Sequence, residues 1–272
     1  MNTKVGLFGI GLETYWAQFD GLLDHLKIYQ GEIRDRIASF GVDVVDAGMV
    51  DNLVKAGEAA EYLKKQDVDI VFLYVATYAL SSTVLPVARK LKVPVIILNL
   101  QPVARLDYET FNKSGDSGRM TGIWLEHCQA CSVPEIACVF NRTGIRYEIV
   151  TGYLKDEEAW KDIQAWTEAA GAVRALCNNR MGILGHYYCG MLDVYTDITK
   201  QSAVFGTHFE MLEMCELKKY RDSVTFEEVE EKIREFGEAF DIVPECEPAE
   251  IERAARTSIA LDRIIKHHNL SS

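Results

Sequence analysis

The stretch VDIVFLYVA, residues 68–76, decides the fold of this 272-residue chain. It is a nearly continuous apolar run, rich in β-branched and aromatic residues, and its length suits a strand better than a helix. A strand that is apolar on both of its sides is typical of a parallel sheet covered on both faces. The run therefore predicts one strand of an α/β sheet.

Similar runs recur on both sides of this stretch, and segments with helical spacing separate them. The expected strands are residues 4–11, 42–45, 68–76, 93–100 and 147–150, and the expected helices are 15–40, 51–65, 83–91, 119–141 (broken near Pro134) and 156–177. Such alternation implies βαβ units with right-handed crossovers. The sequence thus predicts a doubly wound α/β domain with Rossmann-like or flavodoxin-like layers over residues 1–178.

The last part of the chain repeats the alternation only briefly. From Arg180 to Ser272 we count two strands, within 181–185 and 203–213, and about three helices. Sheets usually hold four or more strands. We therefore expect residues 179–272 to be a second, incomplete α/β domain, and the chain to be a truncated piece of a longer protein.

Charge and composition exclude several classes of protein. With 29 basic and 41 acidic residues, the net charge is −12, which should repel nucleic acid and anionic membranes. The sequence has neither an apolar run long enough to span a membrane nor a signal peptide, so we expect a cytoplasmic protein. The seven cysteines are then expected to be free thiols. Cys128-x-x-Cys131 looks like a redox or metal pair, but we interpret it as structural because it lies in a helix-like stretch and lacks a second pair for zinc.

The loops that follow the expected strands contain the candidate binding residues, because ligands of open α/β sheets bind at the carboxyl ends of the strands. The candidates are Glu13, Tyr15 and Trp16 after the first strand, Asp46 after the second, and His186, Tyr187 and Met191 in the second domain. His186 is the best single candidate for function. These side chains suit hydroxyl groups and rings, and no P-loop or nucleophile elbow is present. Asp46 resembles a ribose-binding acid, but Gly6-x-x-Gly9-x-Gly11 reverses the dinucleotide order.

Five of these stretches, in the same order, resemble the L-arabinose isomerase family. More closely, they are similar to arabinose-isomerase-like members of the L-fucose/L-arabinose isomerase superfamily, and the resemblance covers essentially the whole chain. The stretches are GLFGIGLETYWAQF (6–19), FLYVATYALSSTVLP (72–86), VIILNLQP (95–102), MTGIWLEHCQACSVPEIACVFNR (120–142) and GILGHYYCGMLDVYTD (182–197).

The resemblance implies a three-domain enzyme of carbohydrate metabolism that interconverts an aldose and a ketose, with a pentose or deoxyhexose as substrate. It implies Mn²⁺ held by glutamates and histidines that lie beyond residue 272. We therefore expect no catalytic or metal-binding residue in this chain and no metal bound by it alone. It also implies a homo-oligomer, a trimer or hexamer, in which the first domain helps to close the sugar site of a neighbouring subunit.

Carried over by position, the resemblance implies sugar contacts for Glu13, Tyr15, Trp16 and Met191. Glu13 replaces the usual glutamine, and residues 129–132 lack a histidine of the arabinose enzymes, so the sugar stays open. The leading hypothesis is the N-terminal part of a metal-dependent sugar isomerase, serving site closure and assembly. The alternatives are a stand-alone sugar- or nucleotide-binding α/β protein and an interaction domain with a decayed site.

Overall fold

The computed structural model describes residues 2–113 and 115–271, without the side chain of residue 110. Contacts within the chain divide it into two compact units, residues 1–174 and residues 175–272. No helix among the described residues is both long enough and apolar enough to cross a bilayer.

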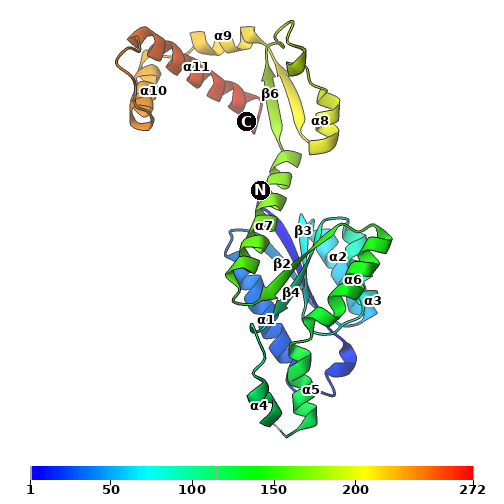
Figure 1. Cartoon of the computed structure of the whole chain (residues 1–272). Coiled ribbons are helices and arrows are strands. Elements are labelled where there is room, and N and C mark those ends of the chain that lie inside the picture. The colour runs from blue at the N-terminus through cyan, green and yellow to red at the C-terminus, as the bar shows by residue number, and fades with distance from the viewer. Residues whose placement is uncertain (1, 114, 272) are drawn as a thin grey trace. The chain divides into compact units, whose positions relative to one another are not determined.

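The first unit is built on a five-stranded sheet in which every neighbouring pair of strands is parallel (Figure 1). Its strands are β1 (Lys4–Ile10), β2 (Asp43–Val50), β3 (Ile70–Val75), β4 (Val95–Gln101) and β5 (Tyr147–Tyr153). The order is β2-β1-β3-β4-β5, so β3 is the middle strand, and all of its residues are buried. The predicted parallel α/β sheet is confirmed, because an apolar strand such as β3 needs cover on both faces.

Helices cover both faces of this sheet and divide the core in two. One layer contains α1 (Leu22–Ala38) and α7 (Glu157–Cys177), and the other contains α2 (Leu53–Gln66), α3 (Ser81–Leu91) and α6 (Gln129–Thr143) (Figure 1). Successive side chains of β1 alternate between the layers, with Leu7 in the α1 cluster and Phe8 in the α2 cluster. The short helices α4 (Tyr108–Lys113) and α5 (Ser117–Glu126) follow β4, and a 3₁₀ turn, η1 (Glu13–Tyr15), follows β1.

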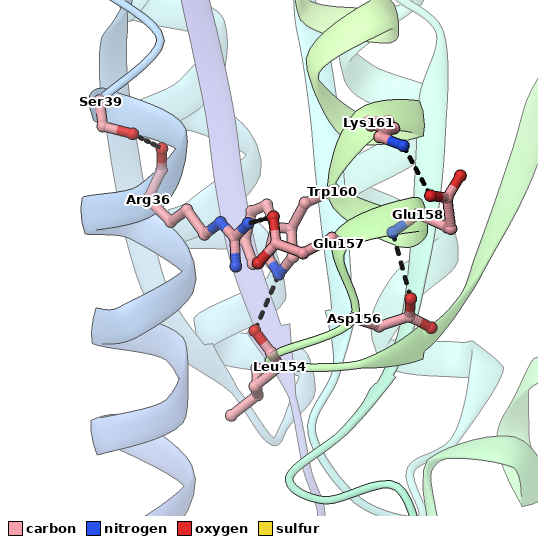
Figure 2. A network of polar contacts seen from close by, with 8 residues as sticks. All are labelled: Arg36, Ser39, Leu154, Asp156, Glu157, Glu158, Trp160 and Lys161. Carbon is pink, nitrogen blue, oxygen red and sulfur yellow. Dashed lines mark hydrogen bonds and ion pairs between the residues drawn. The ribbon is translucent and has the colours of Figure 1, made fainter.

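Helix α7 contacts α1 through the guanidinium of Arg36, which stacks on the aromatic ring of Trp160 (Figure 2). The guanidinium of Arg36 lies 4.4 Å from the ring centroid of Trp160 and donates a hydrogen bond to Glu157 at 2.7 Å. Trp160 Nε1 donates to the carbonyl of Leu154 at 2.8 Å. The buried indole therefore has a partner for its only polar group, which fixes the start of α7 against the sheet.

Three local predictions were wrong. The strand expected at 42–45 continues to Val50, so Asp46 lies inside β2 rather than in a loop at its end. The pairing of β2 with β1 shifts register near Gly48, whose φ of 74° is available to glycine, and this irregularity extends the strand. The helix expected from residue 15 begins only at Leu22, after Gly21 with φ 80°.

The third error concerns the helix pair expected over 119–141. The break falls at His127–Cys128, and Pro134 lies within α6. The cause is the buried side chain of Gln129, whose Nε2 donates to the carbonyl of Ala76 at 3.0 Å. This bond attaches the start of α6 to the end of β3, so α6 begins before the proline.

The second unit contains a two-stranded parallel sheet of β6 (Arg180–Leu184) and β7 (His208–Leu212). Its other elements are η2 (Leu192–Val194), α8 (Ile198–Phe205), α9 (Met214–Asp222), α10 (Phe226–Ala239) and α11 (Pro248–His267), one helix more than the sequence indicated. Two small buried clusters hold it together, one between β7, α9 and α11 and one between α10 and α11. Beside β6, Ser271 N donates to the carbonyl of Arg180 at 2.8 Å.

Candidate functional site

The loop after β1 is joined to the end of β2 by a buried carboxylate. Asp51 directly follows β2 and is 3% exposed, and its Oδ2 accepts hydrogen bonds from Trp16 Nε1 at 2.8 Å and from Lys55 Nζ at 2.7 Å. On the outside of the same cluster, Asn52 Nδ2 donates to Glu13 Oε1 at 3.1 Å. Two of the predicted sugar contacts, Glu13 and Trp16, are thus held at the carboxyl edge of the sheet.

The glycines of β1 explain how this loop folds. A Cβ on Gly11 would lie 2.7 Å from the Trp16 ring, and a Cβ on Gly9 would collide with the side chain of Gln30. The absent side chains therefore make room for Trp16 and Gln30. A dinucleotide fold uses such glycines to approach a pyrophosphate instead.

Asp46, the acid that resembled a ribose ligand, is also engaged within the protein. Its Oδ1 accepts hydrogen bonds from Gln30 Nε2 at 2.7 Å and from Gly48 N at 2.8 Å. Asp51 follows the end of β2, where Asp46 was expected to lie. Its carboxylate is buried and accepts a hydrogen bond from Trp16. These contacts weigh against nucleotide binding at this edge.

A cavity of about 660 Å³, here named the loop–α5 pocket, lies next to the first loop. Its lining includes Gln18, Phe19, His25, Asp116, Arg119 and Glu126. The ring of Tyr15 packs edge-on against Phe19, with 5.9 Å between the centroids, so the predicted Tyr15 adjoins the pocket without lining it. Amide, imidazole, guanidinium and carboxylate groups around one aromatic ring are suited to a ligand with many hydroxyl groups.

A carboxylate that is nearly buried organises one wall of the loop–α5 pocket. The side chain of Glu126 is 13% exposed; its Oε1 lies 2.7 Å from His25 Nδ1, and its Oε2 accepts a hydrogen bond from the Tyr29 hydroxyl at 3.2 Å. Burial and the negative charge of Glu126 raise the pKa of Tyr29 to about 12. The carboxylate thereby fixes the orientation of an imidazole that borders the cavity.

Sequence reasoning missed this group, because His25 lies within the helix expected over residues 15–40 and nothing near it in the sequence marks it as a binding residue. The signal that could have found it is the four-residue spacing of His25 and Tyr29, which places both side chains on one face of α1. Their common partner, Glu126, is about a hundred residues away along the chain, so no local pattern connects them.

The other predicted contacts belong to the second unit. His186, Tyr187 and Met191 follow β6 in an exposed segment, and the ring of Tyr187 lies 5.6 Å from that of Tyr195. All three side chains are open to solvent. This segment begins at Gly185, whose φ of 83° turns the chain away from the strand.

Imidazole and carboxylate groups that could bind a metal ion come close together among the described residues of the second unit. Among them, one grouping of possible ligands has its atoms within 4.8 Å of one another, Glu216 with His267 and His268. It offers two imidazoles and one carboxylate. His268 Nε2 is 2.7 Å from Glu216 Oε1, so two of the three groups contact each other directly.

Two comparisons with known proteins identified no similar protein. A scan against models of protein families found no match, and a search among curated proteins also found none.

Proposed function

We propose that this chain is the N-terminal part of a metal-dependent aldose–ketose isomerase, and that it binds and encloses the sugar. The loop–α5 pocket is the observation that carries the proposal. Its volume falls within the range of about 300–1,000 Å³ that is usual for small-molecule sites. The ordered resemblance to arabinose-isomerase-like proteins supports the same class of activity.

The chemistry of the pocket favours a neutral sugar. His25 and Gln18 can exchange hydrogen bonds with hydroxyl groups, and Phe19 offers a ring face for the apolar side of a sugar. Two of the glycines that a phosphate-binding loop would use are instead packed against Trp16 and Gln30. In the proposal, the metal and the carboxylate that moves the proton come from residues outside this chain.

We assign sugar contacts to the two predicted loops, each within its own unit. Glu13, Tyr15 and Trp16 are the proposed contacts in the first unit, and His186, Tyr187 and Met191 are those in the second. The first of these loops is rigid because Trp16 and Glu13 are both hydrogen-bonded to residues that follow β2. Rigid placement reduces the entropy lost when a ligand binds.

The second unit supports a role in assembly. Several large apolar side chains in its segment 188–205 are open to solvent, among them Tyr188 at 72%, Leu192 at 73% and Val204 at 64%. Burial of such residues in a homo-oligomer, a trimer or hexamer, would remove them from water. The two-stranded sheet also leaves strand edges for further strands of a longer protein. We place the enzyme in the cytoplasm because all seven cysteines are free.

Isomerase activity tests the proposal directly. Pentoses and 6-deoxyhexoses are assayed with Mn²⁺ on this chain and on the product of the native gene. We expect activity in the native product and none in this chain alone. Activity in this chain alone would contradict the proposal, because its own residues would then have to bind the metal.

A binding experiment tests the pocket itself. We expect Phe19→Ala and His25→Ala each to weaken sugar binding about tenfold, as the loss of one good contact of about 1.4 kcal/mol would do. The matched control is Phe240→Ala, an exposed phenylalanine of the second unit outside segment 188–205. Sugar binding with no isomerase activity in any product would favour the stand-alone binding protein, and equal effects of all three variants would exclude the pocket.

A further inference from the structure

Two cysteines at the start of α6 lie within contact distance. Cys128 is the residue that precedes the helix, and Cys131 lies in its first turn. The Cys128 thiol donates to Cys131 Sγ, and the two sulfurs are 3.0 Å apart. Cys128 is 3% exposed, whereas Cys131 is open to solvent. An external reagent can thus reach the Cys131 sulfur, whereas the Cys128 sulfur is buried next to it.

The residue after each cysteine is fixed by buried hydrogen bonds. Gln129 donates to the carbonyl of Ala76, and Ser132 Oγ both accepts from Ala79 N at 2.8 Å and donates to its carbonyl at 3.0 Å. The side chains of Gln129 and Ser132 are fully buried. The first turn of α6 is therefore tied to the segment after β3, and the two thiols are held in place rather than brought together by chance.

This arrangement fits the requirements of a disulfide. Residues three apart on a helix have Cβ atoms about 5–6 Å apart, and a disulfide needs about 3.5–4.5 Å. Cys128 precedes the helix with φ −98° and ψ 27°, and the two sulfurs already lie 3.0 Å apart, so a bond requires a further approach of about 1 Å. Cys131 is the exposed sulfur of the two, so an external disulfide can reach it. Burial keeps Cys128 in its thiol form, since it raises the pKa of that group to about 12.

A metal would need more ligands than this pair offers. Within the described part of the chain, neither cysteine belongs to a grouping of three ligand atoms. Structural zinc sites use four. The two sulfurs therefore suit electron exchange better than metal binding.

We propose that Cys128 and Cys131 form a redox-active dithiol that exchanges with low-molecular-weight disulfides. The Cys131 thiolate attacks one sulfur of R–S–S–R, which forms a mixed disulfide and releases RS⁻. The Cys128 thiol then gives its proton to solvent and attacks the Cys131 sulfur, which releases the second RS⁻. Two protein thiols are oxidised to one intrachain disulfide, and the external disulfide is reduced to two thiols.

The dithiol also lies near Tyr15 of the first loop. Burial is the main cause that raises the pKa of Tyr15, and the nearby Tyr78 and Cys128 raise it further. Tyr15 in turn packs against Phe19 of the loop–α5 pocket. Oxidation of Cys128 changes the surroundings of this loop whether or not the pocket binds a sugar, so the inference does not depend on the proposed function.

Thiol mapping of the full chain tests the proposal, with oxidised glutathione as the probe. After alkylation and peptide mass spectrometry, we expect the wild-type chain to contain a Cys128–Cys131 disulfide. Cys128→Ser should instead accumulate glutathione on Cys131, at least tenfold more than the wild type. The matched control is Cys138→Ser, because Cys138 is an exposed cysteine on the same helix; it should behave like the wild type.

Three results would overturn the proposal. One is that the wild-type chain retains glutathione on Cys131 to the same extent as the Cys128→Ser variant. A second is glutathione on Cys131 no faster than on Cys138. The third is that Cys128 in the Cys131→Ser variant takes up glutathione as fast as Cys131 does in the wild type. If circular dichroism shows that Cys128→Ser is unfolded, the wild-type map and Cys131→Ser still decide the question.

Discussion

The contact between Gly11 and Trp16 shows how one absent side chain shapes the first loop. We expect Gly11→Ala to destabilise the chain by about 1–3 kcal/mol, because the new Cβ would lie 2.7 Å from the Trp16 ring and overpack the site. The measurement is urea unfolding followed by tryptophan fluorescence. The control is Gly57→Ala in α2, where a Cβ meets open space; helix propensity should make it about 0.5–1 kcal/mol more stable. The same shift in both variants would contradict this packing.

Trp160 provides a second prediction for one residue. Trp160→Phe removes the donor to the Leu154 carbonyl, and we expect a loss of about 1–3 kcal/mol in the free energy of unfolding, because that carbonyl is left without its partner. Trp124→Phe is the control, since that ring is 49% exposed and should change stability little. Equal losses in thermal or urea unfolding would show that the indole hydrogen bond is unimportant.

The contact between Tyr29 and Glu126 predicts a dependence on alkaline pH. The folded chain holds the Tyr29 proton up to a pKa of about 12, whereas the unfolded chain loses it near 10. The resulting stabilisation is complete below pH 10 and is lost as the pH rises to about 12. We therefore expect the wild type to lose more stability than Tyr29→Phe across this window.

Glu126→Gln separates the two causes of this shift. It removes the charge but leaves Tyr29 buried, so the pKa of Tyr29 should fall towards its ordinary value without reaching it. Phenolate absorbance, recorded as the difference from Tyr29→Phe, measures that pKa. An unchanged value would mean that Glu126 does not affect the tyrosine.

Among the elements, α10 depends on its first turn. Thr225 Oγ accepts from Glu228 N, and the Glu228 carboxylate accepts from Thr225 N, which completes a capping box. We expect Thr225→Ala to cost about 1 kcal/mol, measured by chemical unfolding. The control is Thr257→Ala in α11, whose hydroxyl bonds back to Arg253 within the helix and whose replacement should be neutral or slightly favourable.

The same capping box gives α10 an acid sensitivity. The backbone N–H of Thr225, followed by Arg263, lowers the pKa of Glu228 below its ordinary value of 4.5. The stabilisation is therefore present above pH 4.5 and is lost as the pH falls through the lowered pKa. Glu228→Gln removes the titrating group and should lack this dependence. Hydrogen exchange of α10 as the pH is lowered measures it, and identical curves for the two chains would contradict the role of the cap.

The elements also show what the sequence can predict. The apolar run that forms β3 identified the sheet, because burial on both faces leaves a clear composition. The end of β2 could not be placed, since its extension depends on pairing with β1 and on the backbone of Gly48. The start of α6 could not be predicted for a similar reason. It depends on the hydrogen bond from Gln129 to the end of β3, which is far away in the sequence.

The candidate site was predictable only where it is local. Glu13, Tyr15 and Trp16 follow a strand, and topology alone places such residues at the carboxyl edge. Asp51 and the group of His25 with Glu126 come together through contacts between distant segments. Periodicity carries no information about such contacts. The role of the predicted residues in sugar binding stays a prediction.

At the scale of the whole molecule, the two units differ greatly in buried core. The described residues of the first unit form two clusters of twenty buried residues each, whereas those of the second form clusters of four and three. Each cluster contains residues from one unit only. Since buried apolar area is the main favourable contribution to folding, the second unit should be much less stable.

We therefore expect the second unit to open first. Hydrogen exchange should be slowest for the amides of β1, β3 and β4 and markedly faster for those of β6 and β7, because local opening follows the stability of each cooperative unit. Leu217→Ala should speed exchange only in the second unit, and Leu73→Ala, which removes a side chain from the first core, should speed it in the first. Uniform exchange across both units, or one shared response to either substitution, would mean that the chain unfolds as a single cooperative body.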